Sequence, residues 1–247
     1  MVLLPQLTFL LGLLGMMMVC CLTETRSHVV IASFIMAVTL VLVWMVPDGL
    51  YWDIWRVDLL AKITQSVCII LSILVLFWTA RYYPIGQLFS VSLLILCALL
   101  GCFTIISSQN FILLYVGLEL LALPTYALCA VDRWAENSYE AALKYFVMGA
   151  VASIFILYGL SFIYTATGSM NYLAVSNWFD MQDTSMLFYM NLGAVFILAG
   201  FCFKLGVAPF HMWVPDVYQS APIGVVSWLA VVPKVALVTM LLRFMML

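Results

Sequence analysis

Charged residues are scarce in this chain. Only 8% of its 247 residues are Asp, Glu, Lys or Arg, whereas 67% are hydrophobic and the mean hydropathy is +1.19. Soluble domains carry about 25% charged residues, so this composition excludes a soluble globular protein. With so few charges present, the formal net charge of −2 gives little information about partners.

Recognisable cofactor motifs are also missing. The cysteines form no CxxC pair and no cluster with histidine, and no iron–sulfur, haem or flavin signature is found. We therefore expect no cofactor and no metal in this chain, and interpret the cysteines as apolar filling within the membrane spans. There are seven: Cys20, Cys21, Cys68, Cys97, Cys102, Cys129 and Cys202.

Long apolar runs occupy most of the sequence. A bilayer core about 30 Å thick requires roughly 20 apolar residues per helix. We predict about eight spans on that basis, at 3–22, 28–46, 60–80, 87–106, 109–131, 141–166, 187–209 and 222–245. The first run is too long for a signal peptide and has no basic residues before it, so we interpret it as a retained helix. The predicted fold class is all-α, a polytopic transmembrane helix bundle.

The basic residues predict an orientation. The positive-inside rule favours an N-terminus outside the cell. This places Arg26, Arg81, Arg133 and Lys144 on the cytoplasmic side and Arg56, Lys62 and Arg243 on the opposite side. On that opposite side, segment 47–58 combines three carboxylates with three aromatic residues. We predict that it lies along the membrane surface, because aromatic rings favour the headgroup level.

Three charged residues lie well inside the predicted spans: Glu119, Lys204 and Lys234. A charge at bilayer depth costs roughly 2.5 to 17 kcal/mol, depending on the reference state, so it normally faces protein or water. These residues are therefore the main functional candidates. The structural alternative is that the lysines extend to the membrane surface and Glu119 makes one supporting salt bridge.

Each of these charges has a proline on the same predicted span: Pro124 for Glu119, Pro209 for Lys204 and Pro233 for Lys234. A proline inside a helix removes the hydrogen bond to the carbonyl four residues back and tends to kink the helix. Broken helices at membrane depth occur where the backbone lines a protein cavity or a water-filled path. The prolines therefore predict hydrated breaks beside the charges, with the clearest break in the seventh helix.

A glutamate–lysine pair would suit proton transfer. Two charges 4 Å apart interact by roughly 4 kcal/mol at an effective dielectric constant of about 20. Moving one charge against 100 mV costs only about 2.3 kcal/mol. Movement of Glu119 toward or away from Lys204 would therefore switch the lysine between holding and releasing a proton.

Two further polar residues are candidates. His211 follows the predicted break, where a histidine can relay protons near neutral pH, although a lone loop histidine is equally often structural. Lys144 lies four residues after Glu140, near the start of the sixth helix. Such a pair is usually solvent-exposed and stabilises its helix by a few tenths of a kcal/mol. The alternative for Lys144 is a role in a proton relay.

Three sequence strings carry a family resemblance: YVGLELLALPTYAL, DRWAENSYEAALKYFVMGAVAS and FCFKLGVAPFHMWVPDVYQSAP. Together they resemble the antiporter-like membrane subunits of respiratory complex I, the proton-pumping NADH:quinone oxidoreductase. The subunit N branch, called subunit 2 in mitochondria, is the most similar. The resemblance runs through the whole chain and is densest from about 109 to 236.

The resemblance implies a proton relay. Glu119 in the fifth helix would pair with Lys204 in the broken seventh helix, and Lys234 in the eighth would continue the path. Lys144 and His211 would be further polar members. FMN, iron–sulfur clusters and quinone would belong to other subunits. The implied partners are M-like and K-like neighbours in the bilayer, in a bacterial inner membrane or a mitochondrial one.

The resemblance also implies a domain organisation. Residues 1–86 would form three leading helices and residues 87–247 a first five-helix antiporter-like repeat. The family's second repeat, which carries the outlet lysine, has no counterpart in these residues. A fragment, one product of a split gene with a separate C-terminal half, and a reduced subunit are all open interpretations.

The leading expectation is thus a non-redox, proton-translocating subunit of NADH:quinone oxidoreductase. Two alternatives stay open. One is a subunit of a Na⁺/H⁺ antiporter or membrane hydrogenase of the same ancestry. The other is a purely architectural membrane subunit.

Overall fold

The chain is described by a computed structural model that covers residues 3–20, 27–132, 136–180 and 186–245. These residues are almost entirely helical. The helices are α1 Leu4–Cys20, α2 Ser27–Met45, α3 Leu59–Thr79, α4 Ile85–Ser107, α5 Phe111–Cys129, α6 Glu136–Thr167, α7 Tyr172–Asp180, α8 Leu187–Leu205, α9 Trp213–Ser220 and α10 Ile223–Met245. Two short strands, β1 Gly49–Tyr51 and β2 Trp55–Val57, lie between α2 and α3.

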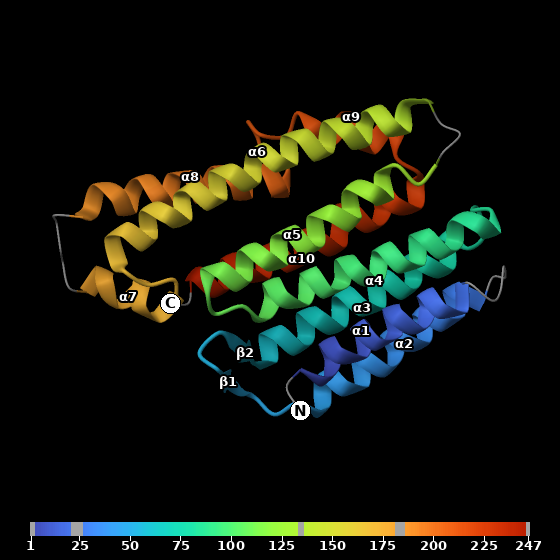
Figure 1. Ribbon diagram of the computed structural model, residues 1–247, viewed down its shortest axis with the longest axis horizontal. Coiled ribbons are helices and arrows are strands. Elements are labelled where there is room, and N and C mark those ends of the chain that lie inside the picture. The colour runs from blue at the N-terminus through green and yellow to red at the C-terminus, as the bar shows by residue number, and fades with distance from the viewer. Residues whose placement is uncertain (1–2, 21–26, 133–135, 181–185, 246–247) are drawn as a thin grey trace.

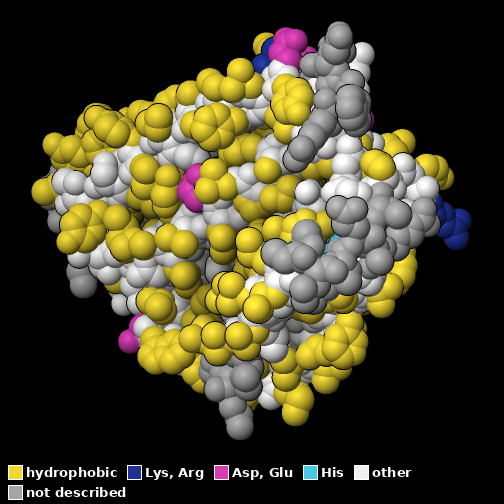
Figure 2. Space-filling model, turned by 45° about the vertical axis from the view of Figure 1, so that its right-hand side comes forward, with side chains coloured by type: hydrophobic (Ala, Val, Ile, Leu, Met, Phe, Trp, Pro, Cys, Tyr) yellow, Lys and Arg dark blue, Asp and Glu magenta, His cyan; other side chains and the backbone are white. Residues whose placement is uncertain are grey.

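The predicted membrane-spanning bundle is confirmed. Seven helices in the described residues are long and apolar enough to cross a membrane: α2, α3, α4, α5, α6, α8 and α10. The first predicted span forms α1, whose apolar stretch Pro5–Met18 is shorter than the others. Figure 2 shows the expected surface: hydrophobic side chains cover most of this face.

The helices lie side by side in neighbouring pairs. Figure 1 shows α1 beside α2, α4 beside α5 and α6 beside α8, and α10 packs against α3 and α4. Helix α4 is the most buried span and packs against α1, α2, α3, α5 and α10. This position follows from its sequence, because an apolar helix with small residues around its circumference can be covered on all sides. The start of α1 and the end of α10 lie toward the same end of the bundle (Figure 1).

Glycines allow the closest helix contacts. A Cβ atom on Gly101 of α4 would lie 2.4 Å from the backbone nitrogen of Leu121 on α5. Helices α6 and α8 also approach closely, since a Cβ on Gly193 would lie 2.8 Å from the carbonyl oxygen of Gly159. Small residues at such contacts let backbones pack tightly where apolar burial alone gives no net attraction in lipid.

Segment 47–58 folds into an antiparallel β-hairpin, which we did not predict. Gly49 pairs with Val57 and Tyr51 with Trp55. The turn is possible because Trp52 and Asp53 adopt the left-handed conformation, with φ of 54° and 56°. Whether the hairpin lies along a membrane surface stays a prediction.

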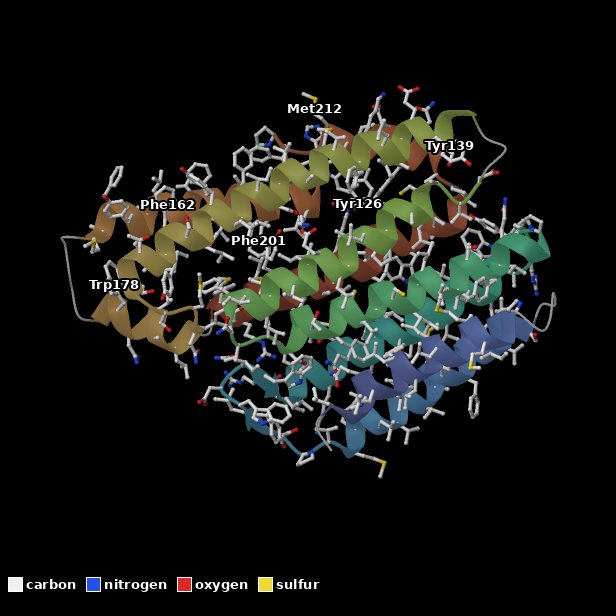
Figure 3. All side chains as sticks on the ribbon, viewed as in Figure 1. Tyr126, Tyr139, Phe162, Trp178, Phe201 and Met212 are labelled. Carbon is white, nitrogen blue, oxygen red and sulfur yellow. The ribbon has the colours of Figure 1, made fainter. Side chains whose placement is uncertain are left out.

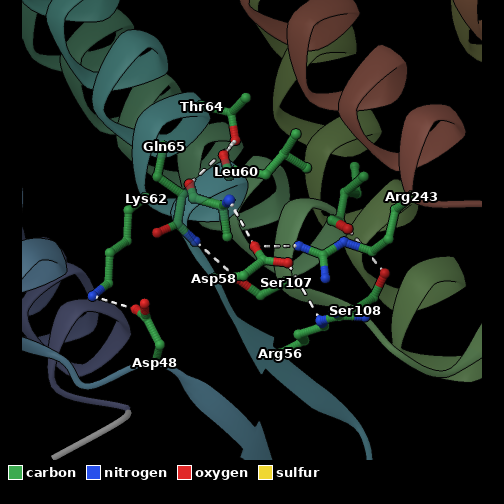
Figure 4. A network of polar contacts seen from close by, with 12 residues as sticks. Asp48, Arg56, Asp58, Leu60, Lys62, Thr64, Gln65, Ser107, Ser108 and Arg243 are labelled. Atoms are coloured by element: carbon green, nitrogen blue, oxygen red, sulfur yellow. Dashed lines mark hydrogen bonds and ion pairs between the residues drawn. The ribbon is translucent and has the colours of Figure 1, made fainter. Parts of the chain in front are cut away.

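An ion-pair cluster ties this hairpin to the ends of α3 and α10 (Figure 4). Asp58 caps α3 by accepting a hydrogen bond from the Ala61 nitrogen at 2.9 Å. The same carboxylate accepts from Arg243 Nη2 at 3.0 Å and pairs with Arg56 Nε at 3.3 Å. Beside it, Lys62 Nζ lies 2.6 Å from Asp48 Oδ1. The cluster fixes one end of α10, the helix that carries Lys234.

The polar connection predicted at 167–186 contains the short helix α7. Its first residue, Tyr172, is buried and shares a hydrogen bond of 3.2 Å with the Ser108 hydroxyl. Burial raises the pKa of Tyr172, while the bond with Ser108 and the charge of Arg243 oppose that rise. Helix α7 is thus anchored to the ends of α4 and α10 rather than free.

The basic residues separate as predicted within the described part of the chain. Arg56, Lys62 and Arg243 meet around the hairpin, whereas Arg81 follows α3 at its other end. Arg26 and Arg133 lie outside the described residues. Which end is cytoplasmic stays a prediction.

The packing at Gly101 gives a first testable prediction. Gly101→Ala should lower stability by about 1–3 kcal/mol, because overpacking a tight contact forces the two backbones apart. The measurement is thermal unfolding of the detergent-solubilised protein. Gly15→Ala in α1 is the matched control, since no atom lies within 4 Å of the added carbon. Equal midpoints for the two variants would contradict the close α4–α5 packing.

Candidate functional site

The structure brings two of the predicted residues together. Lys204 on α8 and Glu119 on α5 are 85 positions apart in the sequence, and Lys204 Nζ lies 3.4 Å from Glu119 Oε1. The lysine side chain is only 10% exposed and the glutamate 30%. An ion pair therefore lies inside an otherwise apolar part of the bundle.

A third residue, Ser153 of α6, joins this pair. Its hydroxyl donates to Glu119 Oε1 at 2.5 Å and accepts from Lys204 Nζ at 3.3 Å. Ser153 could not be predicted from the sequence, because a single serine in an apolar helix usually bonds only to its own backbone. The pair thus becomes a three-residue cluster that connects α5, α6 and α8.

Lys204 lies in the last turn of α8, directly before the predicted break. Gly206 ends the helix with a left-handed φ of 72°, and Val207 N then bonds to Cys202 O at 2.9 Å. The carbonyls at a helix C-terminus carry partial negative charge, which stabilises a nearby ammonium group. The C-terminal end of α8 therefore stabilises the charged form of Lys204, which lipid would not.

One detail of the predicted break is wrong. We expected Pro209 to interrupt a continuing helix and free the carbonyl of Leu205, but α8 has already ended at that residue. The break is made by Gly206, because a glycine tolerates the left-handed conformation that terminates a helix. Pro124 inside α5 and Pro233 inside α10 do lie within helices, as expected.

After the break, α9 is held against α6 by aromatic contacts. Trp213 donates its indole N–H to the Phe203 carbonyl at 2.9 Å. Its ring stacks on Tyr145 of α6, with centroids 4.5 Å apart and an interplanar angle of 12°. One carbonyl at the end of α8 is therefore satisfied by a side chain from beyond the break.

A small cavity lies beside Lys204. Its volume is about 30 Å³, and its lining includes Thr125, Tyr126, Tyr145, Lys204 and Pro233. Figure 3 shows Tyr126 between α5 and α6. A cavity of this size with several polar groups can hold about one water molecule. Its lining thus includes both the lysine of α8 and the proline inside α10.

Lys234, the third buried charge, makes a different contact. It is half-buried on α10, and its Nζ lies 5.7 Å from the centroid of the Tyr218 ring. A cation over an aromatic face is stabilised by about 0.5–2 kcal/mol, depending on desolvation. Lys234 therefore lies against a residue of α9, and it is not among the residues that line the cavity.

Lys144 lies outside the central cluster. Its Nζ is 2.9 Å from Glu140 Oε1, as the spacing predicted, and 3.1 Å from Asp216 Oδ2 of α9. The side chain is 48% exposed. It precedes Ser153 by nine residues on α6, about 13 Å along the helix. Lys144 therefore occupies the exposed end of the α6–α9 contact.

His211 is exposed in the connection between α8 and α9. The structure therefore does not bury it beside the charged pair. Among the described residues, no group of three or more His, Cys, Asp or Glu could hold a metal ion. The five described cysteines are free thiols: Cys68, Cys97, Cys102, Cys129 and Cys202. Cys20 and Cys21 are not among the side chains that the structure describes.

Known relatives are similar to this chain in sequence. A protein of Polaromonas naphthalenivorans named NADH-quinone oxidoreductase subunit N is 48% identical over 160 residues, which cover 65% of this chain and 31% of that protein. The subunit of the same name from Pelagibacter ubique is 34% identical and covers 98% of this chain. This chain spans about half the length of that relative, 52%.

A solved structure agrees with these relatives. A chain of respiratory complex I from Thermus thermophilus superposes with a TM-score of 0.80 and 29% identity, covering 97% of this chain and 53% of that one. The bacterial relatives and the seven apolar helices support a multi-pass protein of the bacterial inner membrane. The resemblance to complex I subunits predicted from the sequence is therefore confirmed.

A family model shows which protein family the chain belongs to. The model described as "NADH:quinone oxidoreductase/Mrp antiporter, TM" matches residues 108–247, more than half of the chain. The matched region contains Glu119, Ser153, Lys204 and Lys234. The chain therefore belongs to the NADH:quinone oxidoreductase/Mrp antiporter transmembrane family.

Proposed function

We propose that this chain is a proton-translocating part of the membrane arm of NADH:quinone oxidoreductase. The observation that carries the proposal is the contact between Lys204 and Glu119, made at a helix break inside an apolar bundle. The names of the relatives support the complex, and the chemistry of the pair supports the role.

The pair would act as a switch for one proton. At 3.4 Å the two charges attract by roughly 5 kcal/mol at an effective dielectric constant of about 20. This exceeds the roughly 2.3 kcal/mol needed to move a charge against 100 mV. While Glu119 stays ionised and near, Lys204 keeps its proton. When Glu119 withdraws or is neutralised, Lys204 releases it.

The released proton would pass toward Lys234. The 30 Å³ cavity beside Lys204 reaches Pro233, the neighbour of Lys234 in α10. One water there would find its hydrogen-bonding partners among the polar lining residues, Thr125, Tyr126, Tyr145 and Lys204. Because Pro233 cannot donate to the carbonyl of Leu229, that carbonyl is one more acceptor in α10.

Protons would arrive from the exposed end of the α6–α9 contact. There Lys144 is paired with Glu140 and Asp216 in a polar surface hollow that also includes Gln219. Carboxylates in water exchange protons readily, so this group can collect them. His211, exposed in the nearby connection, is a second proposed member of the uptake path.

The driving force would come from elsewhere in the complex. Quinone reduction, with FMN and iron–sulfur clusters, would occur in other subunits and would displace or neutralise Glu119 through neighbouring charges. M-like and K-like subunits are the proposed neighbours. Residues 1–86 would be leading helices and residues 87–247 one antiporter-like repeat, so the outlet of the path would lie in a further repeat or a separate polypeptide.

Two other functions make different predictions. A Na⁺/H⁺ antiporter or membrane-hydrogenase subunit would use the same charges, and the family model itself includes Mrp antiporters. Affinity purification with mass spectrometry separates them by the redox subunits that accompany the chain. A purely architectural subunit would keep its fold and partners but would not need protonatable groups.

The central pair gives the second prediction. Lys204→Ala and Glu119→Gln should each reduce coupled proton pumping by at least about 10-fold, because each removes one partner of the switch. Pumping and NADH oxidation are measured in membrane vesicles with normal amounts of assembled complex. Asp53→Asn in the exposed hairpin turn is the matched control. Normal pumping in both pair variants would refute the proposed mechanism.

Lys234 gives the third prediction. Lys234→Met keeps the length and apolar stem of the side chain but removes the ammonium group, so an architectural residue should tolerate it. The proposed relay predicts a loss of pumping of about 10-fold or more. Arg81→Met, at the exposed end of α3, controls for removal of a cation elsewhere. Unchanged pumping in Lys234→Met would favour the architectural function.

A further inference from the structure

The Ser153 hydroxyl provides a second polar route between the two charges, made of two contacts that are each shorter than the direct one. The direct contact from Lys204 Nζ to Glu119 Oε1 is 3.4 Å, near the upper limit for a hydrogen bond. Through Ser153 the two contacts are 3.3 Å and 2.5 Å. Ser153 is only 6% exposed, so the protein rather than bulk solvent sets these contacts.

The hydroxyl has one hydrogen and two acceptors for it. One is Glu119 Oε1 and the other is the carbonyl oxygen of Gly149, 3.1 Å away on the same helix. Because a single O–H group cannot donate fully to both, rotation about the Cβ–Oγ bond exchanges the two. Ser153 can therefore lose its bond to Glu119 without becoming an unsatisfied buried group.

A comparison within the chain shows that this arrangement is not the usual one. Ser92 of α4 is also buried, and its hydroxyl donates to the Leu88 carbonyl four residues back at 2.7 Å. That bond is the ordinary local arrangement of a serine in an apolar helix. Ser153 has the same local acceptor available but also contacts both members of an ion pair on two other helices.

We propose that Ser153 carries the proton between Lys204 and Glu119, an inference that rests on the proposed proton-translocating function. The step reloads Lys204 after the lysine has released its proton. The O–H bond of protonated Glu119 breaks and its proton forms a new O–H bond at Ser153 Oγ. In the same step the original Ser153 O–H bond breaks and that proton binds the neutral Lys204 amine. The products are a carboxylate, a serine hydroxyl and an ammonium group, so no charge is left on the serine.

The step leaves the hydroxyl donating to Glu119, as it does in the structure, so it must turn before it can act again. Gly149 O provides the intermediate position, because it accepts the hydroxyl hydrogen once Glu119 is protonated. When Lys204 has released its proton, the hydroxyl turns to the neutral amine. Ser153 thereby makes transfer depend on the protonation state of Glu119.

The test uses Ser153→Ala in the assembled complex, with Ser92→Ala as the matched buried control. Ser153→Ala should reduce the coupled pumping rate by about 10-fold, the lower end of what a positioned proton-transfer group contributes. The ratio of rates in H₂O and D₂O should rise, because proton transfer becomes slower than the other steps. Ser153→Thr retains the hydroxyl and should restore both values. Ser92→Ala should change neither.

Each other outcome overturns the inference. If Ser153→Ala pumps normally with an unchanged isotope ratio, while Glu119→Gln and Lys204→Ala do not, the proton passes directly and only the serine relay is wrong. If Ser153→Ala lowers only the amount of assembled complex, the serine is structural. If the two charge variants also pump normally, the proposed function itself fails.

Discussion

The need to stabilise a buried ammonium group dominates this structure. Lys204 is 10% exposed within an apolar bundle, where an unpaired charge would cost several kcal/mol or more. Glu119 provides the opposite charge, Ser153 a hydroxyl, and the C-terminus of α8 its partial negative charge. These three groups come from α5, α6 and α8, so the buried charge connects the three helices at this point.

The remaining architecture fits around that requirement. Close glycine contacts let α6 and α8 approach until Ser153 reaches the lysine. Gly206 stops α8 directly after Lys204, and Trp213 closes the break from the other side. At the opposite end of α10, the Asp58–Arg243 pair anchors the helix that carries Lys234. The site therefore combines tight helix packing with one helix break, which lies beside the lysine whose protonation has to change.

The sequence predicted the features that depend on strong local signals. Apolar runs predicted the spans, and the cost of buried charge singled out Glu119 and Lys204. It did not predict Ser153, because its role depends on which helices become neighbours. The hairpin at 47–58 was missed because three-residue strands leave almost no periodic pattern. Pro209 was misinterpreted because a nearby left-handed glycine ends the helix first.

The central claim is that Glu119 and Lys204 act as one coupled pair. A double-mutant cycle tests it most directly, with Glu119→Gln, Lys204→Met and the combination compared for coupled proton pumping in the assembled complex. Residues of one network show coupling energies of about 0.5–3 kcal/mol. The account predicts strong coupling, with the double variant no slower than the slower single variant. If the two variants were independent, their free-energy losses would add and their fold-reductions in pumping would multiply in the double variant. That result would contradict the account.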